Sequence, residues 1–267
     1  GGFFLGFSGS VDDAHITFWA AQSLATHGEI LNYNFERVEQ SSALLQVLLL
    51  ALLHSVSNIS IVVLAHITTV LAAIAALFYS GKLAQRISPG LTSTPLLLLA
   101  TSPFFVYWSF SGMEGPLLSL LLVLLLLFTD DLLRENQSLT MVAVLSFAVQ
   151  MTRPEMPVAL CVFALIFFPA RAILKLSIWR WKSLVQFLLV QILVAGFLTA
   201  WRWRYFGDIS PQPVSAKIGD AFFSSLLQGW QYVQQTLLDP CLLLFMALAV
   251  VSSLLVLLRW REPLAVM

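Results

Sequence analysis

Long apolar runs separated by short polar connectors dominate the chain after its first forty residues. Several of them approach the roughly 20 residues that a helix needs to cross the hydrocarbon core of a bilayer. The runs lie at 42–56, 59–80, 94–110, 115–129, 139–151, 156–170, 183–201 and 240–258. This pattern predicts an all-α, polytopic helical membrane protein built around a transmembrane bundle.

The amino-acid composition also indicates a membrane protein. Of its 267 residues 59% are hydrophobic and only 10% are charged, whereas about a quarter of an ordinary soluble domain is charged. The formal net charge is zero, so nothing indicates a nucleic-acid partner. The chain starts at Gly1 in the tail of an apolar stretch and stops at Met267, and we expect further N- and C-terminal parts of the protein.

The basic residues orient the runs, because Lys and Arg are enriched in cytoplasmic connectors. If every run from 94 onward crosses the membrane, most basic residues face the cytoplasm and most acidic residues face outward. The run 42–56 is short and Gln46 interrupts it, so we interpret it as a helix at, or dipping into, the outer surface. We therefore expect a single transmembrane domain over 1–267. It comprises an outer segment with juxtamembrane helices at 8–58, transmembrane helices within 59–258 and a second outer loop at 202–239.

This orientation brings polar residues that are far apart in sequence to the outer ends of the helices. Polar groups that converge at one membrane face suggest a cavity opening there. The candidate residues are Asp12, Asp13, Glu36, Glu114, Arg153, Glu155, Asp208 and Lys217.

The segment "SVDDAHITFWAAQSLATHG" predicts an amphipathic helix near the start of the chain. Its apolar side is expected to carry Ile16, Trp19, Ala20 and Leu24. Ser10 and Asp13 suit an N-terminal capping box, and Gly28 suits a C-terminal stop. This structural explanation leaves Asp12 without a role. Alternatively, the carboxylate pair takes a proton from a substrate hydroxyl or holds a divalent ion.

Two further motifs allow both a structural and a functional interpretation. In "SGMEG", Glu114 is either the third-position acid of a capping box begun by Ser111 or a group pointing into the cavity. In "MTRPEMP", Arg153 either pairs with Glu155 or binds a phosphate or carboxylate of a ligand. Lys217 is either a solvated loop lysine or a cation of the same site. The histidines show no metal-ligand spacing, so we predict no histidine metal site.

The order of the motifs "DDAHITFWAAQSLATHGEILNYNFERVE", "SGMEG", "TRPE" and "YFGDISPQPVSAK" resembles the GT-C glycosyltransferases. These membrane enzymes use polyprenyl-phosphate sugars, and the likeness is greatest to the bacterial branch with the arabinofuranosyltransferases of mycobacterial cell walls and to mannosyltransferase-like relatives. The resemblance covers about residues 9 to 219. The sequence departs from the family pattern at His15, after "ERVE" and in "SPQPVSAK", which leaves the sugar open.

The resemblance implies a GT-C-like bundle in the bacterial inner (cytoplasmic) membrane, with its active site facing outward. The implied reaction moves a sugar from a polyprenyl-phosphate donor to a glycan or lipid acceptor with inversion. Asp12 would be the general base, supported by Asp13, and Lys217 and Arg153 would bind the donor phosphate. Glu36, Glu114, Glu155 and Asp208 would line the sugar or acceptor pocket. The resemblance implies no organic cofactor, and it leaves open whether the reaction uses a divalent cation.

Three alternatives remain. A transporter or flippase would place ionisable residues near mid-membrane and contain an inverted repeat, and the sequence has no evident repeat. An O-antigen ligase or polymerase would use outer arginines and a histidine in a long loop, and the loop 202–239 has no histidine. The third alternative is a non-catalytic GT-C relative.

Overall fold

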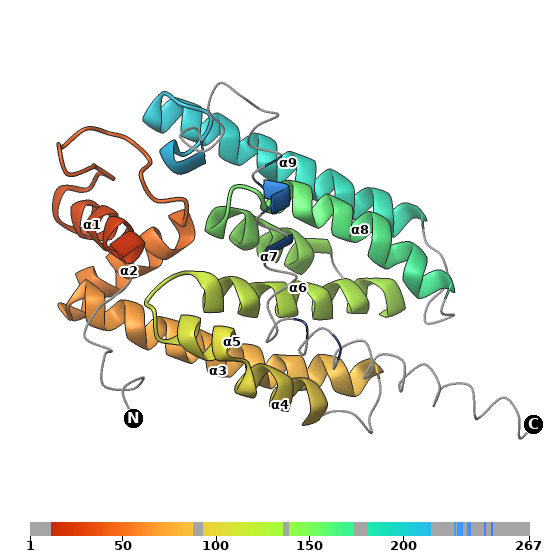
Figure 1. Cartoon of the computed structure of the whole chain (residues 1–267). Helices are drawn as coiled ribbons and strands as arrows, with labels where there is room; N and C mark the ends of the chain where they lie inside the picture. The colour runs from red at the N-terminus through yellow and green to blue at the C-terminus, as the bar shows by residue number, and fades with distance from the viewer. Residues whose placement is uncertain are drawn as a thin grey trace, which may run out of the picture.

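The computed structural model describes residues 12–87, 93–135, 139–173 and 181–214, with isolated residues between 227 and 247. Within this part of the chain all regular secondary structure is α-helical (Figure 1). The helices are α1 (Asp12–His27), α2 (Leu44–Ser57), α3 (Ile61–Ile87), α4 (Ser93–Thr101), α5 (Pro103–Ser109), α6 (Gly115–Glu135), α7 (Leu139–Thr152), α8 (Met156–Ile173) and α9 (Trp181–Phe206). The predicted run 240–258 lies outside the continuously described residues.

The long helices run back and forth along one bundle (Figure 1). The turns 110–114 and 153–155 and the end of α9 lie at the end of the bundle where α1 and α2 pack. We call this the α1 end. At the opposite end, Arg86 of α3 forms an ion pair with Asp131 of α6. Because the helices alternate in direction, several residues that the sequence analysis predicted on the outer side lie at the same end of the bundle, although they are distant in sequence.

Three described helices are long and apolar enough to cross a membrane, namely α3, α6 and α9. Their spans cover Ile61–Arg86, Gly115–Leu133 and Trp181–Phe206, with mean hydropathy of 2.5, 2.1 and 2.0. The apolar helices Leu139–Thr152 and Met156–Pro169 are shorter. These findings confirm the predicted all-α membrane bundle, although fewer of the described runs reach spanning length than the sequence suggested.

The predicted continuous helix over 94–110 is wrong, because the chain breaks between α4 and α5. Pro103 cannot donate a hydrogen bond to the preceding turn, and its ring clashes with a continuing helix. The Ser102 side chain instead accepts the N–H of Phe105 and caps a new helix at 3.4 Å. Two short helices therefore replace one crossing.

The chain also turns between α2 and α3, at the place where the sequence separated two apolar runs. Asn58 adopts a left-handed conformation with φ of 55°, and its N–H bonds to the carbonyl of His54. Asn tolerates this conformation better than most residues. The turn lets α2 pack against α1, α3 and α7.

Two buried clusters form the core, one at the α1 end and one among α6, α7, α8 and α9. The first cluster places Ala14, Phe18 and Ala21 of α1 against α2 and α3. The buried face of α1 is therefore centred differently from the predicted apolar side: Ala20 is buried and Leu24 packs against the cluster, but Ile16 and Trp19 are only half-buried. Trp19 stacks on Tyr33 with ring centroids 4.7 Å apart, whereas the alanines allow close helix packing.

Gly28 ends α1 as the sequence predicted. Its φ is +74°, and its N–H bonds to the carbonyl of Leu24 at 3.0 Å. Glycine adopts this left-handed conformation without the steric cost that a Cβ brings. The stop at Gly28 directs the following loop, residues 28–43, back across the α1 end.

Candidate functional site

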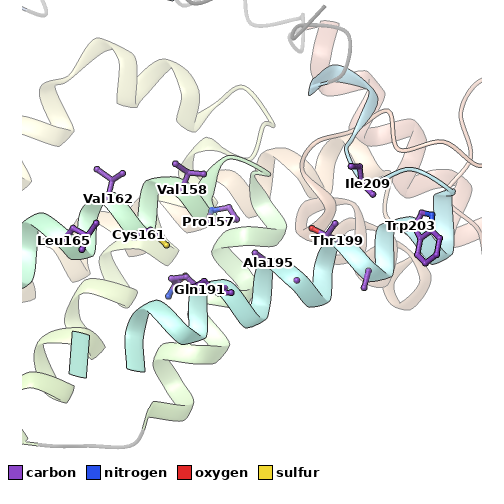
Figure 2. A pocket seen from close by; sticks show the side chains of 13 residues that line it. Pro157, Val158, Cys161, Val162, Leu165, Gln191, Ala195, Thr199, Trp203 and Ile209 are labelled. Atoms are coloured by element: carbon purple, nitrogen blue, oxygen red, sulfur yellow. The ribbon is translucent and has the colours of Figure 1, made fainter. Parts of the chain in front are cut away.

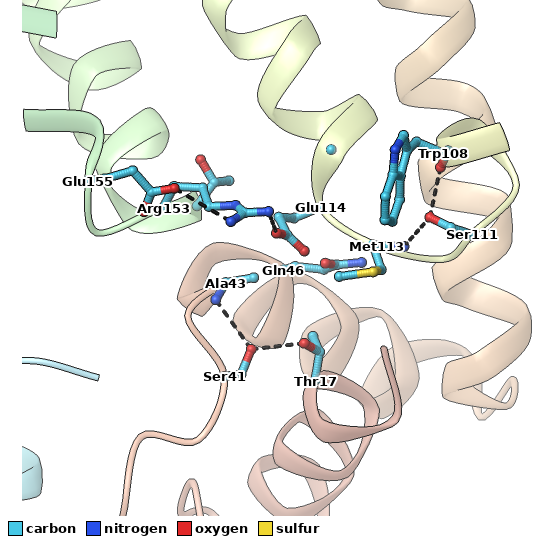
Figure 3. Close-up of polar contacts among 12 residues, drawn as sticks. Thr17, Ser41, Ala43, Gln46, Trp108, Ser111, Met113, Glu114, Arg153 and Glu155 are labelled. Carbon is cyan, nitrogen blue, oxygen red and sulfur yellow. Dashed lines mark hydrogen bonds and ion pairs between the residues drawn. The ribbon is translucent and has the colours of Figure 1, made fainter. Parts of the chain in front are cut away.

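The turns before α6 and after α7 meet through an ion pair (Figure 3). Glu114 is only 3% exposed, and its Oε1 lies 2.7 Å from Nη2 of Arg153. Nη1 of Arg153 lies 3.5 Å from Oε1 of Glu155. The structure thus brings together three of the predicted site residues, with two carboxylates around one guanidinium.

The capping box predicted for Ser111 and Glu114 is wrong, because α6 begins at Gly115. The Ser111 hydroxyl donates to the carbonyl of Trp108 at 2.8 Å and accepts the N–H of Met113 at 3.1 Å. Gly112 has φ of +75°, which lets the loop turn tightly between these residues. The Glu114 side chain consequently points toward Arg153 instead of capping the helix.

Buried polar contacts connect this turn to α1 and α2 (Figure 3). The amide Nε2 of Gln46 in α2 donates to the carbonyl of Gly112 at 2.7 Å. The hydroxyls of Thr17 and Ser41 are 2.8 Å apart, and the Ser41 hydroxyl accepts the N–H of Ala43 at 3.2 Å. These bonds fix the position of α1 relative to Glu114. Gln46, which the sequence presented only as an interruption of an apolar run, is a structural anchor.

Asp12 and Asp13 form the first turn of α1. Asp13 is exposed. The side chain of Asp12, the proposed cap Ser10 and the predicted cation Lys217 lie outside the described residues. Their roles therefore stay predictions.

Glu36 and Asp208 are exposed, and each makes a local contact in a loop. Oε2 of Glu36 accepts a hydrogen bond from the Asn32 amide at 2.8 Å. Oδ1 of Asp208 accepts the N–H groups of Ile209 at 2.6 Å and Ser210 at 3.4 Å. Both carboxylates thus help to shape the turns on which they lie.

A second ion pair, which the sequence did not predict, is deeply buried. Nε of Arg202 in α9 lies 2.9 Å from Oε2 and 3.2 Å from Oε1 of Glu39. Glu39 is 4% exposed and Arg202 is 5% exposed. Arg202 and Arg204 lie two positions apart, and on a helix this spacing places one of them inward and the other outward.

Further contacts hold the loop 28–43 against the end of α9. The N–H of Ile30 donates to the Tyr205 hydroxyl at 3.0 Å, and the Arg37 guanidinium lies 5.3 Å from the centre of the Tyr205 ring. The N–H of Gln212 donates to the carbonyl of Glu39 at 3.0 Å. The loop, α9 and the turn 207–214 therefore form one packed unit.

The acidic residues of this loop differ in their electrostatic surroundings. Burial raises the pKa of Glu39 above its ordinary value, and the neighbouring Arg202 offsets only part of this effect. The hydrogen bond from Arg37 lowers the pKa of Glu29, whose side chain is 44% exposed. Arg202 thus counteracts the effect of burial on the pKa of Glu39, whereas Glu29 forms an ion pair with Arg37 at the surface.

Within the described residues, no group of three or more His, Cys, Asp or Glu side chains has an arrangement suited to a metal ion. Comparison with known proteins identifies no relative: no family model, no curated protein and no solved structure matches this chain significantly. The fold and the site define an all-α membrane protein with a polar, ion-paired α1 end.

Proposed function

We propose that this protein is a membrane glycosyltransferase of the GT-C type, with a polyprenyl-phosphate-linked sugar as donor and a glycan or lipid as acceptor. The main support is the contact between Glu114 of "SGMEG" and Arg153 of "TRPE", at 2.7 Å. Two motifs that carry the GT-C resemblance thus meet at the end of the bundle where the acidic pair begins α1. If the two motifs take part in the same reaction, their residues have to lie at the same site.

In the proposed reaction, Asp12 removes the proton from the acceptor hydroxyl as its oxygen attacks the anomeric carbon of the donor sugar. The bond between this carbon and the phosphate oxygen breaks, and the phosphate leaves with the electron pair, so the configuration inverts. One general base suffices, because the departing phosphate needs no proton. Asp13 supports the base or binds a divalent cation.

The charged groups around the leaving phosphate have separate roles in this proposal. Arg153 and Lys217 stabilise its negative charge. Glu114 and Glu155 hold the Arg153 guanidinium in position, at 2.7 Å and 3.5 Å. With Glu36 and Asp208 they also contact sugar or acceptor hydroxyls.

The proposed chemistry predicts that Asp12→Asn lowers sugar transfer by roughly 10² to 10⁴-fold, the usual contribution of a general base. The assay uses membranes containing the full chain, with polyprenyl-phosphate arabinofuranose and polyprenyl-phosphate mannose as donors. Mass spectrometry of the envelope glycans provides the readout. Asp13→Asn should cause a smaller loss.

Glu29→Gln is the matched control, because it removes another acid of the outer segment that pairs only with exposed Arg37. Transfer by this variant should equal that of the wild type. Undiminished transfer by both Asp12→Asn and Asp13→Asn would refute the proposed base.

We further propose that the α1 end faces outward from a bacterial inner membrane, because the sequence pattern predicts that most basic residues lie in cytoplasmic connectors. Single cysteines replacing Asn34 and Gln85, both at exposed positions, should react with a membrane-impermeant maleimide from opposite sides. The background carries Cys161→Ser and Cys241→Ser. Labelling of both positions from the same side would contradict the proposed topology.

A further inference from the structure

The two carboxylates that contact Arg153 differ in burial and in the closeness of the contact (Figure 3). Glu114 is buried, and its Oε1 lies 2.7 Å from Nη2 of Arg153. The Glu155 side chain is 56% exposed, and its Oε1 lies 3.5 Å from Nη1, which is longer than the usual charge-assisted bond of about 2.7 to 2.9 Å. Glu155 can therefore turn into water without disturbing the core, whereas Glu114 cannot.

Glu155 covers the part of Arg153 that a ligand would reach. The Arg153 side chain is 39% exposed, and Glu114 holds its Nη2 from the interior. A ligand that arrives from water therefore meets the Nη1 side, where Glu155 lies. Since a guanidinium pairs with a phosphate through two parallel N–H···O bonds, a phosphate has to displace Glu155 to bind in this way. The displacement is easy, because an exposed ion pair contributes little free energy.

The position of Glu155 suits the phosphate of a lipid. Glu155 directly precedes α8, whose exposed side chains Val158, Val162 and Leu165 border an open apolar groove between α8 and α9 (Figure 2). These side chains suit contact with hydrocarbon, whereas Arg153 and Glu155 lie at the end of α8 where the apolar surface stops. The polar headgroups of a bilayer lie just beyond its hydrocarbon core, so a lipid phosphate would lie at this level.

The displaced carboxylate still acts on the bound phosphate through its charge. At neutral pH one guanidinium and two carboxylates formally carry one net negative charge, so Glu155 repels a phosphate at Arg153. Coulomb repulsion is proportional to the charge of the ligand. A phosphodiester carries one negative charge, whereas a phosphomonoester carries nearly two. The repulsion from Glu155 is therefore about twice as large for the monoester.

The proposed reaction converts a phosphodiester donor into a phosphomonoester. The bond between the anomeric carbon and the phosphate oxygen breaks, this oxygen keeps the electron pair, and Asp12 holds the acceptor proton, so the phosphate gains one negative charge. We propose that Glu155 is a specificity-determining residue at Arg153, which favours the singly charged donor over the doubly charged product and thereby promotes product release. This inference deepens the proposed function and rests on it for the identity of the two ligands.

The test measures binding to the full chain in uncharged detergent micelles by phosphorus NMR titration. The probes are octyl methyl phosphate, a diester with one charge, and octyl phosphate, a monoester with nearly two charges at about pH 8. Glu155→Gln should tighten diester binding roughly two- to fivefold, the usual effect of one exposed charge pair. It should tighten monoester binding by about the square of that factor. An equal gain for both probes, or no gain, would overturn the inference.

Glu29→Gln is the matched control, because it removes the same charge from another exposed ion pair, with Arg37 in the loop 28–43. The titrations use an ionic strength of about 0.1 M, at which charges more than about 10 Å apart are largely screened. Glu29→Gln should leave the ratio of the two dissociation constants as in the wild type. A change as large as that in Glu155→Gln would assign the effect to overall charge and contradict the inference.

A paired substitution tests whether the probes bind at Arg153. Replacing Glu114 and Arg153 together by glutamine removes the guanidinium without leaving a buried carboxylate unpaired. Binding of both probes should weaken at least about tenfold, as expected when hydrogen bonds to a charged group are lost. Binding as tight as in the wild type would show that the phosphate lies elsewhere and would contradict the inference.

The transfer assay separates this inference from the proposed function. In the Glu155→Gln variant, polyprenyl phosphate should inhibit sugar transfer more strongly relative to the KM for the donor. Sugar transfer with unchanged inhibition would refute only the inference. Charge-dependent binding of the probes without any sugar transfer by the wild type would refute only the proposed function.

Discussion

Replacing Arg202 by methionine should destabilise the protein by about 3 to 5 kcal/mol, the cost of removing one partner of a buried ion pair. Glu39 is 4% exposed, so its carboxylate would be left in the interior without the neighbouring guanidinium. Methionine retains much of the side-chain length, which limits the loss of packing. The midpoint of thermal unfolding in detergent, followed by tryptophan fluorescence, measures the effect.

Arg204→Met is the matched control, because Arg204 is exposed two positions further along the same helix. Its effect should stay within about 0.5 kcal/mol, as for most surface substitutions. The double substitution Glu39→Leu with Arg202→Met should recover much of the loss, since it leaves no uncompensated charge. Equal midpoints for Arg202→Met and Arg204→Met would show that the buried pair contributes little.

The destabilisation in Arg202→Met should also depend on pH. Burial raises the folded-state pKa of Glu39 above the ordinary value of 4.5, so the folded protein holds this proton more tightly than the unfolded chain. The Glu39 contribution to stability therefore falls as pH rises from the ordinary pKa through the raised one. Without Arg202 this fall should be larger, so the midpoint should drop more than in the wild type as the pH is raised above the ordinary pKa of a glutamate. Adding Glu39→Gln should remove the extra dependence.

The second large effect is expected at Gly112, where alanine should destabilise the protein by roughly 2 to 5 kcal/mol. The backbone φ of +75° costs an L-residue about 1 to 2 kcal/mol. A Cβ at this position would also lie 3.0 Å from Cζ of Phe18, and overpacking a core costs about 1 to 3 kcal/mol. The same unfolding measurement applies.

Gly28→Ala separates the two causes. Gly28 has nearly the same φ, +74°, but a Cβ there meets no atom within 4 Å. Gly28→Ala should therefore destabilise the protein by only about 1 to 2 kcal/mol, the cost of the left-handed backbone conformation for a residue with a Cβ. If both alanine variants unfold at the same temperature, the contact between the added Cβ at position 112 and Phe18 costs no measurable stability. That result would contradict the overpacking part of the prediction.

Local sequence signals predicted much of the fold because their physical causes act over a few residues. The Gly28 stop and the separation of two apolar runs near Asn58 both reflect backbone conformations that few residues tolerate. Pro103 was a comparable signal, and the break between α4 and α5 follows from it. The length of the apolar run concealed this signal, since composition alone cannot tell one helix from two.

The candidate site was predictable only in part, because most of its contacts join distant segments. The motifs around Glu114 and Arg153 indicated a shared location, and the two side chains form an ion pair. The pairing of Glu39 with Arg202 depends on which side of α9 faces the loop 28–43. Neither charge pattern nor periodicity determines that choice, because aromatic and basic residues alternate through "WRWRYF". The buried face of α1 was likewise decided by packing against α2 and α3.

The contact between Glu39 and Arg202 also constrains the order of events during synthesis. Its two partners are 163 residues apart, and at 5 to 20 residues per second this distance corresponds to roughly 8 to 33 seconds of translation. During this interval Glu39 has left the ribosome while its counter-ion has yet to be made. The loop 28–43 therefore cannot complete its packing until α9 has been made, although α1 itself is synthesised early.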